Sequence, residues 1–147
     1  MTYARISGIG SYLPDRVLTN HDLEKMMDTS DDWIRERTGI RRRHLAGDSE
    51  TTASMGFEAA RRALDMAGVS AEEIDLIIVG TCTPDKVIPA SACIIQRHLG
   101  IAGGGAMDVN AACSGFVYGL DIANRFFQTG GARKALVIGS ETLSRIT

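Results

Sequence analysis

The sequence predicts an α/β layered fold in which a largely parallel sheet is covered by helices. Three short apolar stretches have the length and composition of buried strands: residues 74–79, 106–110 and 134–139. Three longer stretches have helical periodicity and alternate with them: residues 52–67, 90–99 and 116–129. This alternation is typical of parallel strands that are joined by helical crossovers.

Local signals predict further elements before the first long helix. Residues 3–13 are expected to form a strand in which Gly8 and Gly10 allow another backbone to approach closely. Capping-box spacing begins at Thr19 (residues 19–22) and again at Thr29 (residues 29–32), and each box opens a short helical pattern, so two short helices are expected there.

The composition is that of an ordinary globular domain, with 147 residues, 44% hydrophobic and 23% charged. A formal net charge of −2 gives no general attraction to nucleic acid or to an anionic membrane, and no window is long enough to span a bilayer. Cys82, Cys93 and Cys113 have neither CxxC nor zinc-like spacing, so no metal site is predicted. A reduced, cytoplasmic compartment is expected.

The segment around Cys113 carries the clearest candidate for chemistry. A predicted buried strand at 106–110 is followed by a turn of small residues at 111–115 and by a helix with Phe116, Leu120, Ala123 and Phe127 on one face. The unpaired N–H groups and the dipole of a helix amino end favour thiolate over thiol, and small neighbours let a carbonyl carbon approach the sulfur. Cys113 is therefore a candidate nucleophile. The alternative is a small buried hydrophobe, which free cysteines usually are.

A second candidate site lies in residues 31–44. Five arginines against three acidic residues give this segment a charge of +2 in an acidic protein, and it contains Trp33, the only tryptophan. An aromatic ring beside arginines is suited to stacking an adenine and to pairing with phosphates. On residue types alone, a solvated surface helix with a half-buried anchoring tryptophan is the favoured alternative.

Several segments along the whole chain together resemble β-ketoacyl-acyl carrier protein synthase III, the condensing enzyme that starts bacterial fatty acid synthesis. They are GIGSYLP, TNHDLEKMMDTSDDWIRERTGIRRRH, SMGFEAARRALDMAG, DLIIVGT, DVNAACSGF and ALVIGSETLSR. The resemblance implies a thiolase-like fold of two similar halves, each with a mixed five-stranded sheet covered by helices, in an enzyme that is usually a homodimer. Residues 1–147 would be the amino-terminal half.

The resemblance also implies roles for individual residues. Cys113 would take an acyl group, expected to be acetyl, from a coenzyme A thioester and pass it to the carbanion that forms when malonyl-acyl carrier protein loses carbon dioxide. Thr29, Trp33 and Arg37 would hold the adenine end of coenzyme A. Ile88 and Leu143 would line the acyl pocket. Acyl-CoA is implied as a substrate, and no permanently bound cofactor is implied.

The family's catalytic histidine and asparagine, and its second oxyanion-hole donor, belong to the carboxyl-terminal half. His21, His44 and His98 do not occupy matching positions. The backbone N–H of Cys113 would supply half of the oxyanion hole, and each such donor is typically worth about 3 kcal/mol. The chain is therefore expected to need the other half for activity. The final strand, at 134–139, has no helical pattern after it, which likewise suggests that more protein covers the sheet.

Three alternatives stay open at this point. A relative in secondary metabolism would use the same cysteine with other acyl groups. A non-catalytic dimerisation or binding subunit would share the fold, although the presence of Cys113 argues against it. A thiol redox protein is a poor fit because Cys82 and Cys93 lack the spacing of a resolving cysteine.

Overall fold

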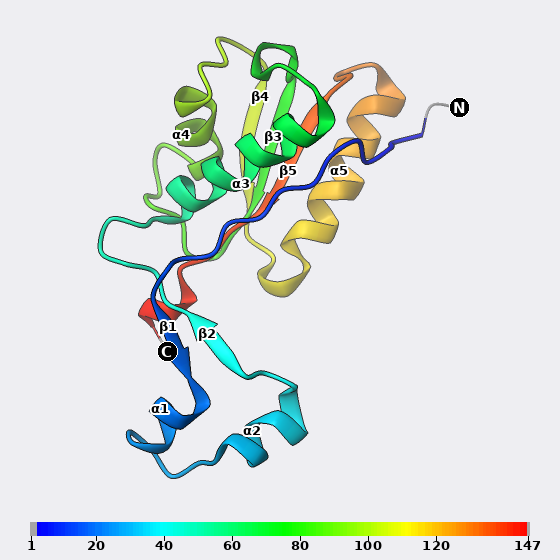
Figure 1. Cartoon of the computed structure of the whole chain (residues 1–147). Coiled ribbons are helices and arrows are strands. Elements are labelled where there is room, and N and C mark those ends of the chain that lie inside the picture. The colour runs from blue at the N-terminus through cyan, green and yellow to red at the C-terminus, as the bar shows by residue number, and fades with distance from the viewer. Residues whose placement is uncertain (1–2, 147) are drawn as a thin grey trace. The chain divides into compact units, whose positions relative to one another are not determined.

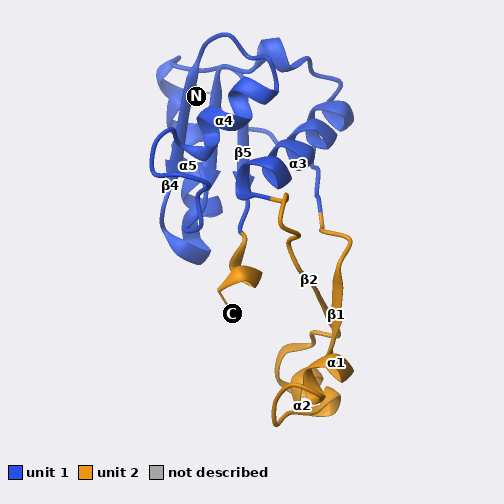
Figure 2. Ribbon diagram, turned by 90° about the vertical axis from the view of Figure 1, so that its left-hand side faces the viewer, with its two compact units in different colours: residues 1–12, 51–141 blue, residues 13–50, 142–147 orange. Residues whose placement is uncertain are grey.

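The computed structural model describes residues 3–146 and confirms the α/β layered class (Figure 1). Among these residues two compact units are distinguished (Figure 2). Unit 1 consists of the described residues in 1–12 and 51–141, and unit 2 of those in 13–50 and 142–147. Within the described range no helix has both the length and the apolar character that a membrane span requires.

Unit 1 is built from three strands and three α-helices. Their bounds are β3 Leu76–Gly80, β4 Gly105–Val109, β5 Ala135–Gly139, α3 Thr52–Ala67, α4 Ser91–His98 and α5 Gly115–Thr129. The strands form a parallel sheet with the order β4-β3-β5. Gly80 at the end of β3 lies opposite Val109 of β4 and Gly139 of β5. The carboxyl ends of all three strands therefore meet at one edge of the sheet.

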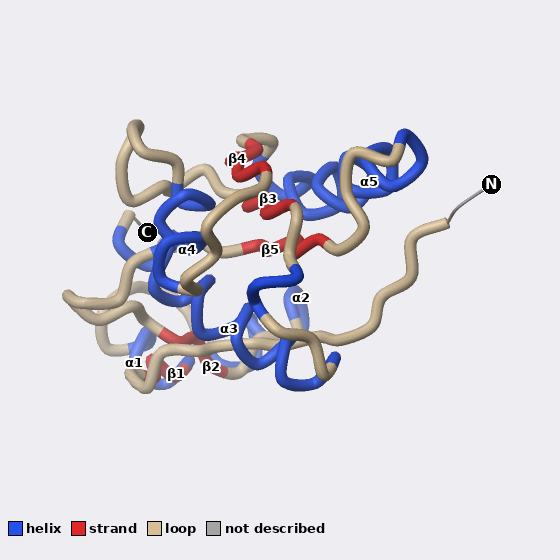
Figure 3. The backbone as a smooth tube through the Cα atoms, turned by 90° about the horizontal axis from the view of Figure 1, so that it is seen from above, coloured by secondary structure: helices blue, strands red, loops and turns tan. Residues whose placement is uncertain are grey.

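Helices cover both faces of this sheet (Figure 3). On one face Ile77 and Val79 of β3 share a buried cluster with residues of α3 and α4. On the other face Leu76 and Ile78 share a cluster with Ala123 of α5. All five residues of β3 are buried, which confirms the prediction of a strand covered on both sides. Burial of such side chains, at about 1.5–3 kcal/mol each, makes β3 the rigid centre of the unit.

Unit 2 contains a two-stranded antiparallel sheet and two short helices. Their bounds are β1 Val17–Thr19, β2 Arg42–His44, α1 Asn20–Glu24 and α2 Asp31–Thr38. Thr19 is the N-cap of α1, as predicted, whereas the N-cap of α2 is Ser30, one residue after the predicted Thr29. The guanidinium of Arg145 donates to the carbonyl oxygens of Gly47 and Glu50, each at 2.7 Å, and joins the chain's last described residues to this unit.

The strand predicted at residues 3–13 is wrong. This segment has no ladder partner in the described chain and runs along α3 instead. The predicted close approach is confirmed, because a Cβ at Gly8 would lie 2.3 Å from the Ala63 carbonyl oxygen and one at Gly10 would lie 2.2 Å from that of Ala59. Glycine serves here to seat an extended segment on a helix rather than in a sheet.

The mixed five-stranded sheet is also wrong for the described residues. Their five strands are divided between the parallel three-stranded sheet of unit 1 and the antiparallel pair in unit 2. The segment at 3–13, which could have enlarged a sheet, pairs with no strand.

Two expectations about burial need correction in the same region. The strand predicted as buried at 106–110 is β4, whose residues are half-buried or exposed because β4 lies at the edge of the sheet. The helix that follows does not bury Phe116, which is 45% exposed. The predicted Ala123 is buried, and Gly115 and Gly119 are buried with it, because only small residues fit where α5 lies closest to the sheet.

Candidate functional site

Cys113 lies in a one-turn 3-10 helix, Ala112–Ser114, between β4 and α5. Ala112 has a φ of 44°, a left-handed conformation that costs a residue with a side chain about 1–3 kcal/mol. The Ser114 N–H closes the turn by donating to the Ala111 carbonyl oxygen at 3.0 Å. This position confirms the predicted place of Cys113 between strand and helix. Cys113 is also exposed, which contradicts the alternative of a small buried hydrophobe.

The turn is held against the sheet by a contact between two backbones. A Cβ on Gly80, at the end of β3, would lie 2.7 Å from the carbonyl carbon of Gly115, the first residue of α5. A Cβ on Gly115 would in turn lie 3.1 Å from the Gly80 Cα. Both positions therefore need glycine. This contact fixes where α5 begins, and with it the position of Cys113 two residues earlier.

The amino end of α5 has no side-chain cap. The Gly115 N–H, the first of the helix, donates to the Ala112 carbonyl oxygen, and the helix end carries a partial positive charge. The charge lies beside Cys113, where it favours an anion, whether a thiolate or the oxygen of a tetrahedral intermediate. Sequence and structure thus agree on the local chemistry that makes Cys113 a candidate nucleophile.

A second exposed thiol, Cys82, lies just past the end of β3 and is bound by Glu141, just past the end of β5. The Glu141 carboxylate accepts hydrogen bonds from the Cys82 N–H at 2.8 Å and from its thiol at 3.2 Å. It also accepts from the Thr83 N–H at 3.1 Å, from the Thr83 hydroxyl, and from the Thr81 hydroxyl at 3.2 Å. One carboxylate therefore binds the whole segment from Thr81 to Thr83.

These contacts shift the proton equilibria of both partners. The hydrogen bond to the Glu141 carboxylate, with smaller contributions from burial and from the Cys113 charge, raises the pKa of Cys82. Burial would raise the pKa of Glu141, but the hydrogen bonds from Thr83, Cys82 and Thr81 outweigh it and lower that pKa. Cys82 is thus held as a thiol.

Sequence reasoning missed Glu141 and its partners, although a signal was present. Thr81, Cys82 and Thr83 directly follow one apolar strand, and Glu141 follows another two residues after its end. In a parallel sheet the carboxyl ends of neighbouring strands share an edge, so polar residues just past them converge. No group of three or more His, Cys, Asp or Glu side chains in residues 3–146 is placed to hold a metal ion.

The second candidate site is on α2, in unit 2. Trp33 is 52% exposed, and the guanidinium carbon of Arg37, one turn further along, lies 4.4 Å from the centre of its ring. Ser30 fixes the start of the helix, because its hydroxyl accepts from the Trp33 N–H at 3.1 Å. Thr29 is half-buried immediately before this cap. The structure brings Trp33 and Arg37 together as an aromatic and cationic surface, and Thr29 lies just before the helix that carries them.

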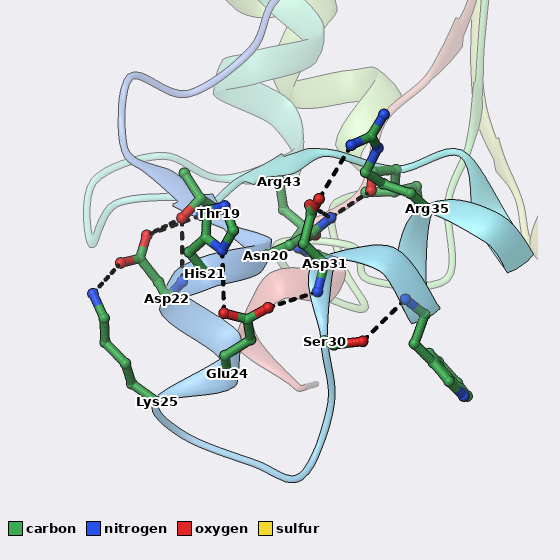
Figure 4. A network of polar contacts seen from close by, with 12 residues as sticks. Thr19, Asn20, His21, Asp22, Glu24, Lys25, Ser30, Asp31, Arg35 and Arg43 are labelled. Atoms are coloured by element: carbon green, nitrogen blue, oxygen red, sulfur yellow. Dashed lines mark hydrogen bonds and ion pairs between the residues drawn. The ribbon is translucent and has the colours of Figure 1, made fainter.

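A buried polar residue that the sequence did not reveal, Asn20, ties this helix to the rest of unit 2 (Figure 4). Asn20 is 1% exposed. Its amide donates to the Asp31 carboxylate and to the Ile40 carbonyl oxygen, both at 2.8 Å, and its oxygen accepts from Arg43 at 2.6 Å. The Asn20 hydrogen bond is the main cause that lowers the pKa of Asp31, the first residue of α2.

The two residues predicted for the acyl pocket are both exposed apolar side chains. Ile88 is 84% exposed in the loop between β3 and α4 of unit 1. Leu143 is 43% exposed in a one-turn 3-10 helix, Leu143–Arg145, of unit 2. Cys113 and Ile88 thus belong to unit 1, whereas Thr29, Trp33, Arg37 and Leu143 belong to unit 2.

The fold, a parallel sheet between helix layers with an exposed cysteine on the turn from strand to helix, is that of the thiolase-like condensing enzymes among the solved structures. The structure of 3-oxoacyl-[acyl-carrier-protein] synthase III from Aquifex aeolicus matches 96% of the chain with a TM-score of 0.92 and 52% identity, over 46% of its own length. The priming β-ketosynthase of the R1128 polyketide pathway matches 97% of the chain with a TM-score of 0.92 and 40% identity, over 42% of its length.

Sequence comparisons find the same similarity. The sequence model of the family 3-oxoacyl-[acyl-carrier-protein] synthase III matches residues 107–147, the segment that contains Cys113. A curated β-ketoacyl-[acyl-carrier-protein] synthase III from Thioalkalivibrio sulfidiphilus is 61% identical over 99% of the chain. The chain is thus similar over nearly its whole length to β-ketoacyl-acyl carrier protein synthase III. It spans about 45% of the length of this relative.

Proposed function

We propose that this chain supplies the acyl-accepting cysteine of a β-ketoacyl-acyl carrier protein synthase III, a condensing enzyme that initiates fatty acid synthesis. The observation that carries the proposal is the exposed Cys113 on a strained turn at the uncapped amino end of α5. The high identity to curated members of the family supports it.

In the proposed reaction the Cys113 thiolate attacks the carbonyl carbon of an acyl-CoA, acetyl-CoA in the first instance. The carbon–sulfur bond to coenzyme A breaks, and coenzyme A leaves as a thiolate that takes up a proton. Malonyl-acyl carrier protein then loses carbon dioxide, and its carbanion attacks the acyl-cysteine, forming a carbon–carbon bond and releasing the Cys113 thiolate. The Cys113 N–H stabilises the oxyanion in both steps.

The α2 surface is proposed to hold the adenine end of coenzyme A. The exposed ring of Trp33 offers a face for stacking, and Arg37 beside it offers a charge for a phosphate. Thr29 supplies a neighbouring contact. Acyl-CoA is then a substrate, and no permanently bound cofactor is required.

The remaining parts of the proposal concern what lies outside the chain. Ile88 and Leu143, both exposed and apolar, are proposed to line the acyl pocket. The catalytic histidine, the asparagine and the second oxyanion donor are proposed to come from a carboxyl-terminal half of the same fold. The complete enzyme is proposed to act as a homodimer in the cytoplasm, with malonyl-acyl carrier protein as its protein partner.

Intact-protein mass spectrometry tests the central step. The chain is combined with the carboxyl-terminal half of a family member and incubated with acetyl-CoA. The mass is expected to rise by one acetyl group, and Cys113→Ala is expected to abolish the increase. Cys93→Ala is the matched control, because Cys93 is free but lies in α4, and it is expected to acetylate normally. Acetylation that persists in Cys113→Ala would refute the assignment.

A second candidate is a condensing enzyme of secondary metabolism. The close structural match to a priming β-ketosynthase of a polyketide pathway favours it among the alternatives. Competition between acetyl-CoA and longer or branched acyl-CoAs for labelling of Cys113 separates the two. Preference for acetyl-CoA supports fatty acid initiation, and preference for another acyl group supports the second candidate.

A further inference from the structure

We propose that Glu141 is a positioning residue that fixes the Thr81–Thr83 segment beside Cys113 and engages the Cys82 thiol, so that Cys113 is the reactive thiol at this edge of the sheet. The inference deepens the proposed function and rests on it for the role of Cys113. It assigns a task to Glu141 and Cys82, which the proposed chemistry does not use.

The Glu141 carboxylate has a full set of hydrogen-bond donors around it. Its two oxygens accept five hydrogen bonds from three consecutive residues, Thr81, Cys82 and Thr83. An ionised carboxylate offers about four lone-pair positions, so these donors saturate it. A glutamine amide in the same place could accept on its oxygen alone, because its nitrogen only donates. The arrangement therefore requires an ionised carboxylate.

Backbone contacts connect the Thr81–Thr83 segment with the elements on either side of Cys113. The Thr81 N–H donates to the carbonyl oxygen of Val109, the last residue of β4, at 3.1 Å. One residue earlier, Gly80 makes the backbone contact with Gly115 that fixes the start of α5. The segment that Glu141 binds is therefore attached to both elements that flank the Cys113 turn.

Cys82 and Cys113 are two thiols that could compete for the acyl group. Cys82 and Cys113 are both exposed, so accessibility alone does not select between them. The Cys82 sulfur donates to Glu141 and must keep its proton to do so. The hydrogen bond to Glu141 is the largest cause that raises the Cys82 pKa; burial, the Glu141 charge and the Cys113 charge raise it further, and a backbone hydrogen bond lowers it by less. The attacking species in acyl transfer is a thiolate, so Glu141 disfavours attack by Cys82.

The experiment measures the rate at which iodoacetamide alkylates each cysteine as a function of pH, using peptide mass spectrometry. It compares the chain combined with the carboxyl-terminal half of a family member and the Glu141→Gln variant of the same assembly. The midpoint of the Cys82 profile is expected to move to lower pH in Glu141→Gln, with a rise of about fivefold in the Cys82 rate at neutral pH. Cys93, part-buried in α4, is the internal reference, and an unchanged Cys93 rate shows that the sheet is intact. Glu141→Asp keeps the charge and is expected to restore most of the upward shift.

An unchanged Cys82 midpoint in Glu141→Gln would overturn the inference, as would Glu141→Asp behaving like Glu141→Gln. Should Glu141→Gln fail to fold, the unaltered protein gives a second measurement. Its Cys82 midpoint is expected to lie at higher pH when native than when unfolded in urea, and equal midpoints would refute the inference. Acetylation of Cys113 is scored separately, so a failure of the proposed function is distinguished from a failure of this inference.

Discussion

The Cys113 turn and the Trp33 helix are both exposed candidate sites, but different forces hold them in place. The turn depends on backbone packing: Gly80 against Gly115, with a left-handed Ala112 between strand and helix. The helix depends on side-chain hydrogen bonds, centred on the buried Asn20 and on its contacts with Asp31 and Arg43.

The difference matches the chemistry proposed for each region. A nucleophile must be placed to a fraction of an ångström, and backbone contacts on a buried sheet have little freedom. A surface that binds the remote end of a substrate tolerates more movement, so polar contacts between side chains suffice. The two regions should therefore respond to different kinds of substitution: the turn to added volume, and the helix to the loss of a hydrogen-bond partner.

The largest effect is expected from a single added methyl group at the backbone contact. In Gly80→Ala the new Cβ would lie 2.7 Å from the Gly115 carbonyl carbon, and neither partner is a flexible side chain that could move away. We expect a loss of about 3 kcal/mol in the free energy of unfolding, at the upper end of the cost of overpacking. Urea denaturation of the protein that contains this chain measures it.

The matched control for this substitution is Gly103→Ala. A Cβ at Gly103 meets no atom within 4 Å, and its φ lies outside the left-handed region. Its free energy of unfolding is expected to change by less than about 0.5 kcal/mol. Equal losses in the two variants would show that Gly80 is not a special contact, and the contrast between the two regions would fail.

A smaller loss is expected when the polar centre of unit 2 is removed. Asn20→Ala deprives the Asp31 carboxylate, the Ile40 carbonyl oxygen and the Arg43 guanidinium of a buried partner. We expect a loss of about 2 kcal/mol, the usual cost of leaving such groups unsatisfied. The neighbouring His21→Ala is the control, since His21 is exposed and pairs with the partly exposed Glu24, and its stability should be almost unchanged. A neutral Asn20→Ala would mean that packing, not hydrogen bonding, holds this region.

How far the sequence could predict these regions follows the same division. Local signals were sufficient where the cause is local, as for α3, whose bounds match the predicted 52–67, and for the cap at Thr19. They failed where the cause lies elsewhere in the chain. Residues 3–13 have the composition of a strand, but a strand also needs a partner, and the segment rests on α3 instead.

The site shows the same limit. The place of Cys113 followed from the order of strand, small residues and helix. An aromatic ring among arginines was expected in residues 31–44, and Trp33 and Arg37 were named there from the family resemblance. Glu141 and Asn20 were missed because their partners are distant in sequence. Glu141 binds residues about sixty positions earlier, and Asn20 binds Arg43 across unit 2.

The smallest effect is expected when acid protonates the Asp22 carboxylate at the amino end of α1. Hydrogen bonds from the Thr19 hydroxyl and N–H, and from Lys25, lower the pKa of Asp22 from 3.8 to about 2. Because the folded pKa is depressed, the contribution of this carboxylate to stability is fully present above about pH 4. It is lost as the pH falls through about 2. An NMR titration of the Asp22 carboxyl carbon should show its midpoint near 2.

Two substitutions at the cap test whether the hydroxyl is the cause. Thr19→Ala removes the strongest of these donors and should raise the Asp22 midpoint toward 3.8, whereas Thr19→Ser keeps the hydroxyl and should leave it near 2. A midpoint that stays low in Thr19→Ala would assign the shift to Lys25 and the backbone instead. Because Asp22 is exposed, the effect on overall stability should be small even when the midpoint moves. A side-chain network of this kind can therefore be adjusted one bond at a time, which the backbone contact beneath Cys113 does not permit.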